Sequence, residues 1–351
     1  MLMGGLDKLD VRIPLGTDRT PWFESLHRAE LRAARGEPSK AYSRVFDLRP
    51  YGIDAVLHER CRYDPHSKLE LAGVRCMSAE QIRTEIERLY ACQADLLKVM
   101  RIDLFADVFD YPVWWFRRNT WVKSKRTVSE FGPHATSSAQ VCESAFENRI
   151  ETLYFGRRPT LFRIYDKGST LRIKYAKEAK QAPACVELPS FAERFGHSED
   201  RIRTRVEHQL CGSNVPHQLS TLGLLFENAA EYDPFATLMM SPIPEPCLIP
   251  TEGDAAAYLQ CVGLACLIKE RGRAATTMML NRKSGRNAAR YMRRLDEFVQ
   301  ANSTADIPNL LAAYRHGITA QIGAQAVAER INALGWQNHT PILENLACNL
   351  Y

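Results

Sequence analysis

The sequence predicts an α+β fold: an antiparallel sheet with helices on one face, followed by a mainly helical C-terminal region. Three observations predict it. Short segments with strand-like alternation of apolar and polar residues occur within residues 9–14, 43–75 and 101–210. A capped amphipathic helix that begins at Ser78 interrupts them. Beyond residue 217 the apolar residues recur mainly at helical spacing.

The composition is that of a soluble globular protein, because 45% of the 351 residues are hydrophobic and 25% are charged. This length fits one large domain or two ordinary ones. The chain has no apolar run long enough to cross a bilayer, and its first residues lack the pattern of a secretory signal. We therefore expect a cytoplasmic protein with no membrane partner. Its ten cysteines include no C-x-x-C pair, which favours reduced thiols over a zinc site.

The N-terminal elements begin with a strand over residues 9–14. A helix follows, with Pro21 in its first turn and Gly36 near its end, and residues 43–75 form short strands and turns. Ser78 and Gln81 have the spacing of a capping box, which predicts the start of a firmer helix. Its buried stripe is predicted to contain Ile82, Ile86, Leu89, Leu96 and Leu97.

Residues 101–108 form a strand that has two carboxylates on one side. Asp103, Phe105 and Asp107 alternate with apolar residues that face the core. Two carboxylates on one face are costly unless they are solvated or paired with a cation, and Mg²⁺ or Mn²⁺ prefers such oxygen ligands. The alternative is an edge strand with a hydrated outer face.

A later strand, residues 203–210, carries a third acidic side chain. Glu207 shares a face with Arg203 and Arg205, while Val206 and Leu210 point to the core. Glu207 can supply a third metal oxygen, and the arginines suit phosphate. A cross-strand salt bridge explains the same pattern without a ligand.

Between these strands, residues 151–168 read as a hairpin in which Tyr165 lies between Arg163 and Lys167 on one face. Neighbouring cations favour the phenolate, the attacking form of a tyrosine whose free pKa is near 10. The alternative is a tyrosine packed at a sheet edge between surface charges. Together, the carboxylates, tyrosine and cations are the groups needed for metal-assisted transesterification of a phosphodiester through a 5′-phosphotyrosine.

Three segments carry a resemblance to a known family: RIDLFADV, ETLYFGRRPTLFRIYDKG and RTRVEHQL, in that order. The chain resembles the replication initiators of filamentous phages and staphylococcal-type rolling-circle plasmids, a family that includes some conjugative relaxases. The resemblance covers about residues 5–235. Like that family, and unlike other nickases, the sequence has no His-hydrophobic-His triplet.

The resemblance implies an enzyme of a bacterial host cell that nicks and rejoins one strand of origin DNA to start rolling-circle replication. It implies Asp103 and Glu207 as ligands of Mg²⁺ or Mn²⁺, with Asp107 as a further candidate. Tyr165 is the first candidate for the nucleophile, with Lys167 as its helper. Tyr175, in RIKYAKEAK, and Tyr154 stay open as alternatives.

Two segments are basic without any acidic residue. Residues 117–126 hold five Lys or Arg, with Trp121 among them, and residues 281–294 hold six. Basic residues interleaved with aromatics suit single-stranded DNA, although either run can equally be a solvated face. The residues predicted to bind DNA are Arg117, Arg118, Lys123, Lys125, Arg126, Arg163 and Arg205.

The predicted organisation is a nickase domain over residues 1–240, a linker over 241–250 and a helical domain over 251–351. The linker contains four prolines, which exclude a regular helix. Helices are expected at 254–272, 274–301, 306–316 and 319–334. The helical domain is expected to contact DNA or a partner.

The expected partners are origin DNA, single-stranded or supercoiled duplex, and a host helicase, with no prediction of the oligomeric state. A conjugative relaxase, a non-catalytic DNA-binding repressor or accessory protein, and a metal-dependent hydrolase that cuts with water remain alternatives.

Overall fold

A computed structural model describes most of the chain. The described residues are 3–29, 41–48, 53, 55–64, 66–71, 74, 77–122, 152–157, 160–181, 189–240, 242, 255–284, 287–302 and 307–322. The strands are β1 (Met3–Pro14), β2 (Tyr42–Asp47), β3 (Ala55–Cys61), β4 (His66–Leu71), β5 (Lys98–Phe109), β6 (Thr120–Val122), β7 (Thr152–Arg157), β8 (Thr160–Asp166), β9 (Arg203–Cys211) and β10 (Leu238–Met240). The helices are α1 (Pro21–Ala29), α2 (Ala79–Leu89), α3 (Val113–Asn119), α4 (Lys167–Gln181), α5 (Phe191–Phe195), α6 (Leu222–Asn228), α7 (Ala255–Arg271), α8 (Arg273–Ser284), α9 (Asn287–Asn302) and α10 (Leu310–Ile322), with 3₁₀ turns at Ala94–Leu96, Gly212–Asn214 and His217–Leu219.

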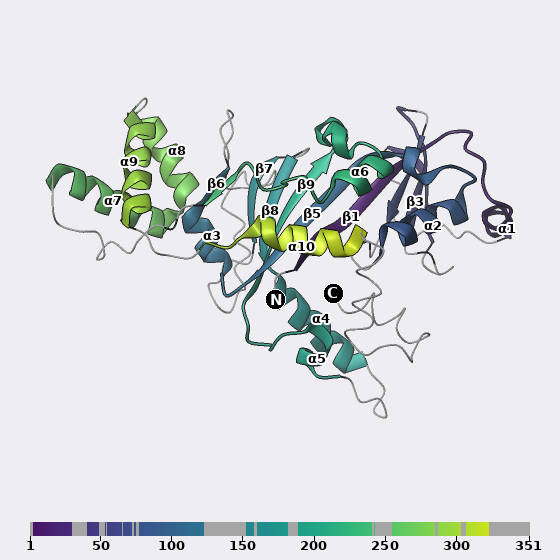
Figure 1. Cartoon of the computed structure of the whole chain (residues 1–351), viewed down its shortest axis with the longest axis horizontal. Helices are drawn as coiled ribbons and strands as arrows, with labels where there is room; N and C mark the ends of the chain where they lie inside the picture. Colours follow the sequence, from purple (N-terminus) through teal and green to yellow (C-terminus); the bar gives the residue numbers. More distant parts are fainter. Residues whose placement is uncertain are drawn as a thin grey trace.

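The fold is α+β, as predicted, and its centre is an eight-stranded sheet (Figure 1). The strand order is β2-β3-β4-β1-β5-β9-β8-β7, and each strand pairs with its neighbours in antiparallel fashion. A separate ribbon pairs β6 with β10. The long strands β1, β5 and β9 lie side by side in the middle, where a side chain has neighbours on both flanking strands.

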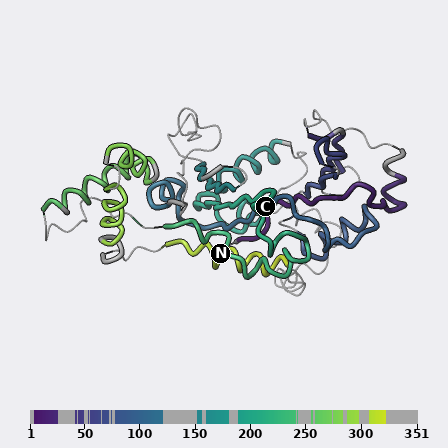
Figure 2. The backbone as a smooth tube through the Cα atoms, turned by 90° about the horizontal axis from the view of Figure 1, so that it is seen from above, coloured from purple at the N-terminus to yellow at the C-terminus, as the bar shows by residue number. Residues whose placement is uncertain are grey.

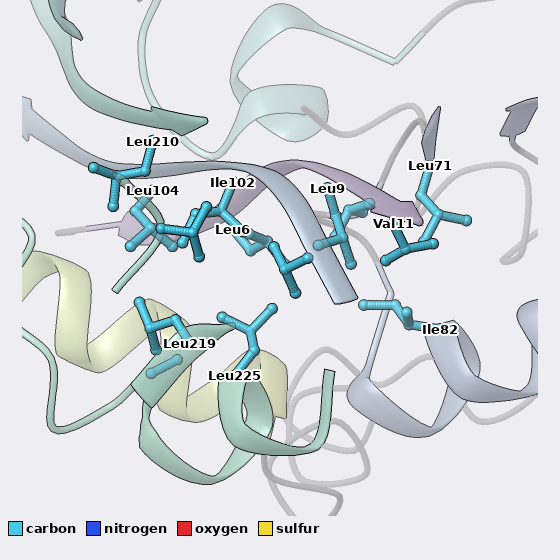
Figure 3. Close-up of a cluster of buried hydrophobic side chains, with 14 of the residues drawn as sticks. Leu6, Leu9, Val11, Leu71, Ile82, Ile102, Leu104, Leu210, Leu219 and Leu225 are labelled. Carbon is cyan, nitrogen blue, oxygen red and sulfur yellow. The ribbon is translucent and has the colours of Figure 1, made fainter. Parts of the chain in front are cut away.

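One face of the sheet carries the main core. Leu104 of β5 and Leu210 of β9 point from this face toward Leu219 and Leu225, in the segment that contains α6 (Figure 3). Helices α2, α6 and α10 lie on this side in Figure 1. The core residues of β5 are those that the alternation predicted, Ile102, Leu104, Ala106 and Val108, and all are buried. The opposite face of the central strands is therefore left for polar side chains.

Helix α2 begins with the predicted capping box. The Gln81 amide donates to the Ser78 hydroxyl at 3.1 Å, and the Ser78 amide donates to the Gln81 side chain at 2.7 Å. The predicted stripe is correct through Leu89 and wrong at Leu96, which is 72% exposed. The helix ends at Leu89, so Leu96 lies on a later 3₁₀ turn and no longer follows the helical spacing.

The last described helix, α10, belongs to the sheet. It packs across β1 and β5, with Tyr314 and Ile318 in the main core. The Gln321 side chain accepts a hydrogen bond from the Leu6 amide at 2.8 Å and donates to the Val74 carbonyl at 2.6 Å. Two helices were expected over residues 306–316 and 319–334, but α10 runs through residues 317 and 318 without a break, and residues 323–334 lie outside the described part of the chain.

Helices α7, α8 and α9 form a separate small core around Leu264, Ile268 and Leu295. Both views show them at one end of the molecule, away from most of the sheet (Figures 1 and 2). Residues 274–301, expected as one helix, contain two: α8 ends at Ser284 and α9 begins at Asn287. The predicted domain 251–351 therefore needs correction: α7–α9 cluster together, whereas α10 completes the core of the sheet.

Across the part of the chain that the structure describes, no helix combines the length and apolar character that a membrane span requires. The Pro-rich segment expected as a linker lies almost wholly outside the described residues, as does Gly36.

Close contact between β1 and α10 gives the first prediction. A Cβ at Gly317 would overlap the backbone of Gly4, so Gly317→Ala must push the helix from the sheet. We expect a loss of about 1–3 kcal/mol in the free energy of unfolding, measured by urea denaturation. Gly263→Ala in α7 is the matched control, because no atom lies within 4 Å of its Cβ and alanine favours a helix by about 1 kcal/mol. Equal changes in the free energy of unfolding for the two variants would contradict the close packing of α10 on β1.

Candidate active site

The predicted polar face exists on the central strands. Register pairs Asp107 with Arg205 and Asp103 with Gln209 across β5 and β9. Opposed residues of an antiparallel pair project to the same side, so all four share one face. On the next strand, β8, Arg163 pairs with Glu207 and Tyr165 pairs with Arg205. The sheet thus brings together carboxylates of β5 and β9 with a tyrosine and cations of β8 and β9.

Asp107 is held by two arginines. Arg205 donates from Nε to Oδ1 at 2.7 Å, and Arg203 donates from Nη2 to Oδ2 at 2.6 Å. All three side chains are fully or almost fully buried. Burial acts to raise the pKa of Asp107, but Arg205 and Arg203 outweigh it and hold that pKa well below its usual value. Asp107 is therefore ionised and ion-paired with both arginines.

Asp103 and Glu207 are also paired. The Arg101 guanidinium donates to both oxygens of Asp103, at 2.8 and 2.6 Å, and Gln209 adds a longer hydrogen bond at 3.2 Å. Arg163 reaches both oxygens of Glu207, at 2.7 and 2.6 Å. Burial raises the pKa of Glu207, and Asp103 and Asp7 add to this, against the lowering effect of Arg163.

As arranged, these carboxylates do not fit a divalent cation. Asp103, Asp107 and Glu207 each accept hydrogen bonds from at least one arginine, and such a cation would have to displace those guanidinium groups. Among the described residues, no group of three or more His, Cys, Asp or Glu is placed to hold a metal. In this arrangement the three carboxylates do not converge on a common site, because the register sets an arginine or glutamine opposite each aspartate.

Tyr165 lies beside Arg163 on β8, as predicted, but Lys167 begins α4 instead of sharing the strand face, and the pKa of Tyr165 moves the other way. The Arg163 guanidinium carbon is 4.9 Å from the centre of the Tyr165 ring. Burial raises the pKa of Tyr165 to about 12; Arg205 lowers it, whereas Glu207 and Asp7 raise it. The expected depression is absent because burial of the phenol outweighs the effect of Arg205 and Arg163, and because carboxylates lie beside the same cations. Lys167, the first residue of α4, is buried and contributes to lowering the pKa of Asp107.

The other two tyrosines differ in position. Tyr154 of β7 pairs with Arg163, so it lies on the same face as Tyr165. Tyr175 follows the start of α4 by eight residues, or roughly 12 Å of helix. Its hydroxyl donates to the Pro189 carbonyl at 3.0 Å, and its ring packs on Phe191. Tyr154 thus shares the polar face with Tyr165, while Tyr175 belongs to a small cluster beside α5.

Asp7 is a site residue that the sequence analysis missed. Leu6 pairs with Leu104 and Lys8 with Asp103, so Asp7 is an extra, bulged residue of β1. Its carboxylate accepts a hydrogen bond from Arg205 Nη1 at 2.7 Å. A sequence signal exists: Leu6 and Leu9 are three residues apart, whereas the later core residues of β1 alternate every second residue.

The residues predicted to bind DNA fall into three groups. Arg117 and Arg118 are half-buried on α3, where Arg117 donates to the Arg271 carbonyl at 3.4 Å. Lys123, Lys125 and Arg126 lie outside the described residues. Arg163 is 35% exposed and accessible to DNA. Arg205 is fully buried between Asp7 and Asp107, so the prediction that it contacts DNA directly is wrong. Next to the α3 arginines, Trp114 is 51% exposed.

Comparison with known proteins gives one distant match. No family model and no curated protein matches the sequence. Among solved structures, the chain is similar to the rolling circle replication initiator protein from Geobacillus stearothermophilus. That similarity has a TM-score of 0.39 and 15% sequence identity, and it covers 76% of this chain and 97% of that one. The proposed function therefore rests on the chain's own residues.

The buried pairs of Asp107 give the second prediction. Asp107→Asn leaves Arg203 and Arg205 without their carboxylate, which we expect to cost about 3–5 kcal/mol in the free energy of unfolding. Since the folded pKa is depressed, Asp107 stabilises the fold above its unfolded pKa of about 4, and this is lost as pH falls further. The difference between wild type and variant should be constant above about pH 5 and shrink below about pH 4.

Asp110→Asn is the matched control for this experiment. Asp110 is 65% exposed, and it also pairs with an arginine, Arg201, at 2.9 Å. An exposed pair contributes about 0–1 kcal/mol, and asparagine tolerates the positive φ of 68° at this position. A loss at Asp107 no larger than the loss at Asp110 would show that the buried network is not formed in solution.

Proposed function

We propose that this protein is a site-specific single-strand DNA endonuclease and ligase that nicks a replication origin to start rolling-circle replication. One observation carries the proposal: a partly exposed tyrosine, Tyr165, lies on a polar sheet face directly beside Arg163 and opposite Arg205. A nucleophile with an adjacent cation suits attack on an anionic phosphodiester. Origin DNA, single-stranded or as a supercoiled duplex, is the substrate.

The proposed reaction is a transesterification. The Tyr165 hydroxyl loses its proton to solvent, and its Oη attacks phosphorus in line. The bond between phosphorus and the 3′ oxygen breaks, and that oxygen takes up a proton to become a free 3′-hydroxyl. The 5′ phosphate stays on the tyrosine. Attack by a 3′-hydroxyl on the phosphotyrosine reverses these steps and rejoins the strand.

Arg163 is the side chain best placed to bind the scissile phosphate. It is 35% exposed, whereas its partner Glu207 is only 2% exposed. A phosphate can replace the carboxylate in the same two-oxygen geometry, since arginine binds both bidentately. Arg205, which is fully buried, would stabilise the Tyr165 phenolate electrostatically from the neighbouring strand and would not contact DNA.

Dependence on Mg²⁺ or Mn²⁺ stays a prediction. A cation there would have to compete with Arg101 for Asp103 and with Arg163 for Glu207. Single-turnover nicking in excess chelator, compared with added Mn²⁺, tests it directly. A host helicase also stays a predicted partner, and no surface of α7–α10 is assigned to it.

The third prediction identifies the nucleophile. Incubation with an end-labelled single-stranded origin oligonucleotide should give a covalent adduct on the 5′ end of the downstream fragment. Peptide mass spectrometry should place it on Tyr165, and Tyr165→Phe should reduce nicking by about 10³-fold or more, because the attacking oxygen is removed. Tyr175→Phe is the control, since its hydroxyl is engaged with Pro189 beside α5.

Other outcomes would move or replace the proposal. An adduct on Tyr154 keeps the chemistry and shifts the nucleophile along the same face. Cleavage without an adduct indicates a hydrolase. Binding without cleavage, unaffected by metal or by Tyr165→Phe, indicates a repressor or accessory protein. Cleavage at a transfer origin, with no effect on replication, indicates a conjugative relaxase.

The fourth prediction concerns pH. Since the pKa of Tyr165 is raised to about 12, the phenolate fraction increases tenfold per pH unit over the neutral range. We expect log(kcat/KM) for nicking to rise with a slope near 1 between about pH 7 and 9, because this quantity reports the free enzyme. A plateau beginning below pH 8 would mean that Tyr165 is not the group that loses the proton.

A further inference from the structure

The unit formed by α7–α9 carries a large excess of positive charge. Residues 255–302, which make up α7–α9, contain nine Lys or Arg and three Asp or Glu, a formal charge of +6. The whole chain carries +5, so the other residues together carry about −1. The sheet, with its paired carboxylates and arginines, is close to neutral. Helices α7–α9 are therefore one source of long-range attraction for a polyanion, beside the basic run 117–126 and helix α4, whose residues 167–181 carry a formal charge of +4.

On α9 the charge lies on one side. Met292 and Leu295 belong to the small core that α9 shares with α7, and Ala288 is buried on the same side of the helix. Arg290, Arg293 and Arg294 are exposed, and at 100° per residue they point away from that core. The one carboxylate among them, Glu297, pairs with Arg293 at 3.6 Å in an exposed position, where such a pair is weak.

This basic unit adjoins the edge of the sheet that carries Tyr154 and Tyr165. Helix α8 contacts α3, and α3 in turn contacts β7 and β8. Arg117 of α3 also donates to the carbonyl of Arg271, at the end of α7. In Figures 1 and 2, α7–α9 lie at the β6 and α3 end of the molecule and α1 at the other. DNA that occupied the polar face could extend over α8 and α9.

We infer that the outward face of α9, with Arg290, Arg293 and Arg294, binds the phosphate backbone of duplex DNA beside the strand that is cut. That the polyanion is DNA rests on the proposed function. Duplex is favoured over single strand because single-strand sites combine cations with exposed aromatics. The described outward residues of α9 are cations, small or polar side chains and Glu297. A helix of 16 residues is also about 24 Å long, which suits a groove or the phosphates at its edge.

The experiment measures how binding depends on salt. A 25-base-pair duplex and a dT oligonucleotide of equal length serve as probes, with fluorescence anisotropy read from about 50 to 300 mM salt. For duplex, the slope of log K against log salt should fall by about 0.9 for each lost phosphate contact, hence by about 2.7 in the triple variant Arg290→Gln, Arg293→Gln, Arg294→Gln. For the dT oligonucleotide, the slope should change by less than the value of one phosphate contact, about 0.7.

Two further variants separate charge from folding. The triple Lys variant of the same positions keeps the charge and should keep the wild-type duplex slope. Arg44 of β2, Arg60 of β3 and Arg62, just after β3, are also exposed and lie away from α7–α9. Their change to Gln removes the same charge and should leave the slope within one contact of wild type. Circular dichroism of each variant reports whether α7–α9 stays helical.

An unchanged duplex slope in the folded α9 triple Gln variant overturns the inference, and so does an equal loss in the Arg44, Arg60 and Arg62 variant. An equal loss for dT overturns the preference for duplex. These readouts do not involve cleavage. If no Tyr165 adduct forms but the α9 variant has a reduced duplex slope, the proposed nicking is rejected and duplex binding by α9 is supported. If the adduct forms but the duplex slope is unchanged, nicking is supported and duplex binding by α9 is rejected.

Discussion

The buried ion pairs between β5 and β9 constrain the rest of the molecule. Asp107 with Arg203 and Arg205 lies in the middle of the sheet, fully out of water. Such charges are tolerated only when each is paired and hydrogen-bonded, since an unpaired buried charge costs several kcal/mol. The polar face can therefore exist only with its carboxylates and guanidinium groups in register. Any substrate or metal that enters must either leave these pairs intact or replace one partner with another of equal charge.

That constraint shapes the chemistry proposed for Tyr165. Its neighbours include both signs of charge, so cations alone do not set its pKa, and burial raises it to about 12. Exchange of the Glu207 carboxylate for a DNA phosphate would keep Arg163 paired while bringing the substrate to the tyrosine, and Glu207, whose pKa burial already raises, would take up a proton. In the free protein, Glu207 thus occupies the position that the proposal gives to the phosphate. The bulged Asp7 adds a second carboxylate near the same tyrosine.

The opposite face and the C-terminal helices explain how this site is supported. Helix α10 packs so closely on β1 that two glycines, Gly4 and Gly317, meet backbone to backbone. It braces β1 and β5, the strands that carry Asp7, Asp103 and Asp107. Helices α7–α9 lie between β10 and α10 in sequence but have their own core. Their charge can therefore serve binding without disturbing the neutral network in the sheet.

Elements whose signals are local could be predicted from the amino-acid sequence alone. Period-two alternation placed Asp103, Asp107, Glu207 and Tyr165 on one face, and the Ser78 capping box located the start of α2, because both patterns depend on near neighbours. The partner of each polar group, in contrast, depends on how the strands are ordered and aligned in the folded sheet. Strand order and register set Asp107 against Arg205 and Glu207 against Arg163, so the expected ligand set became a set of ion pairs. The return of α10 to β1 was likewise undetermined, because contacts between residues some 300 positions apart leave no periodic trace in the chain.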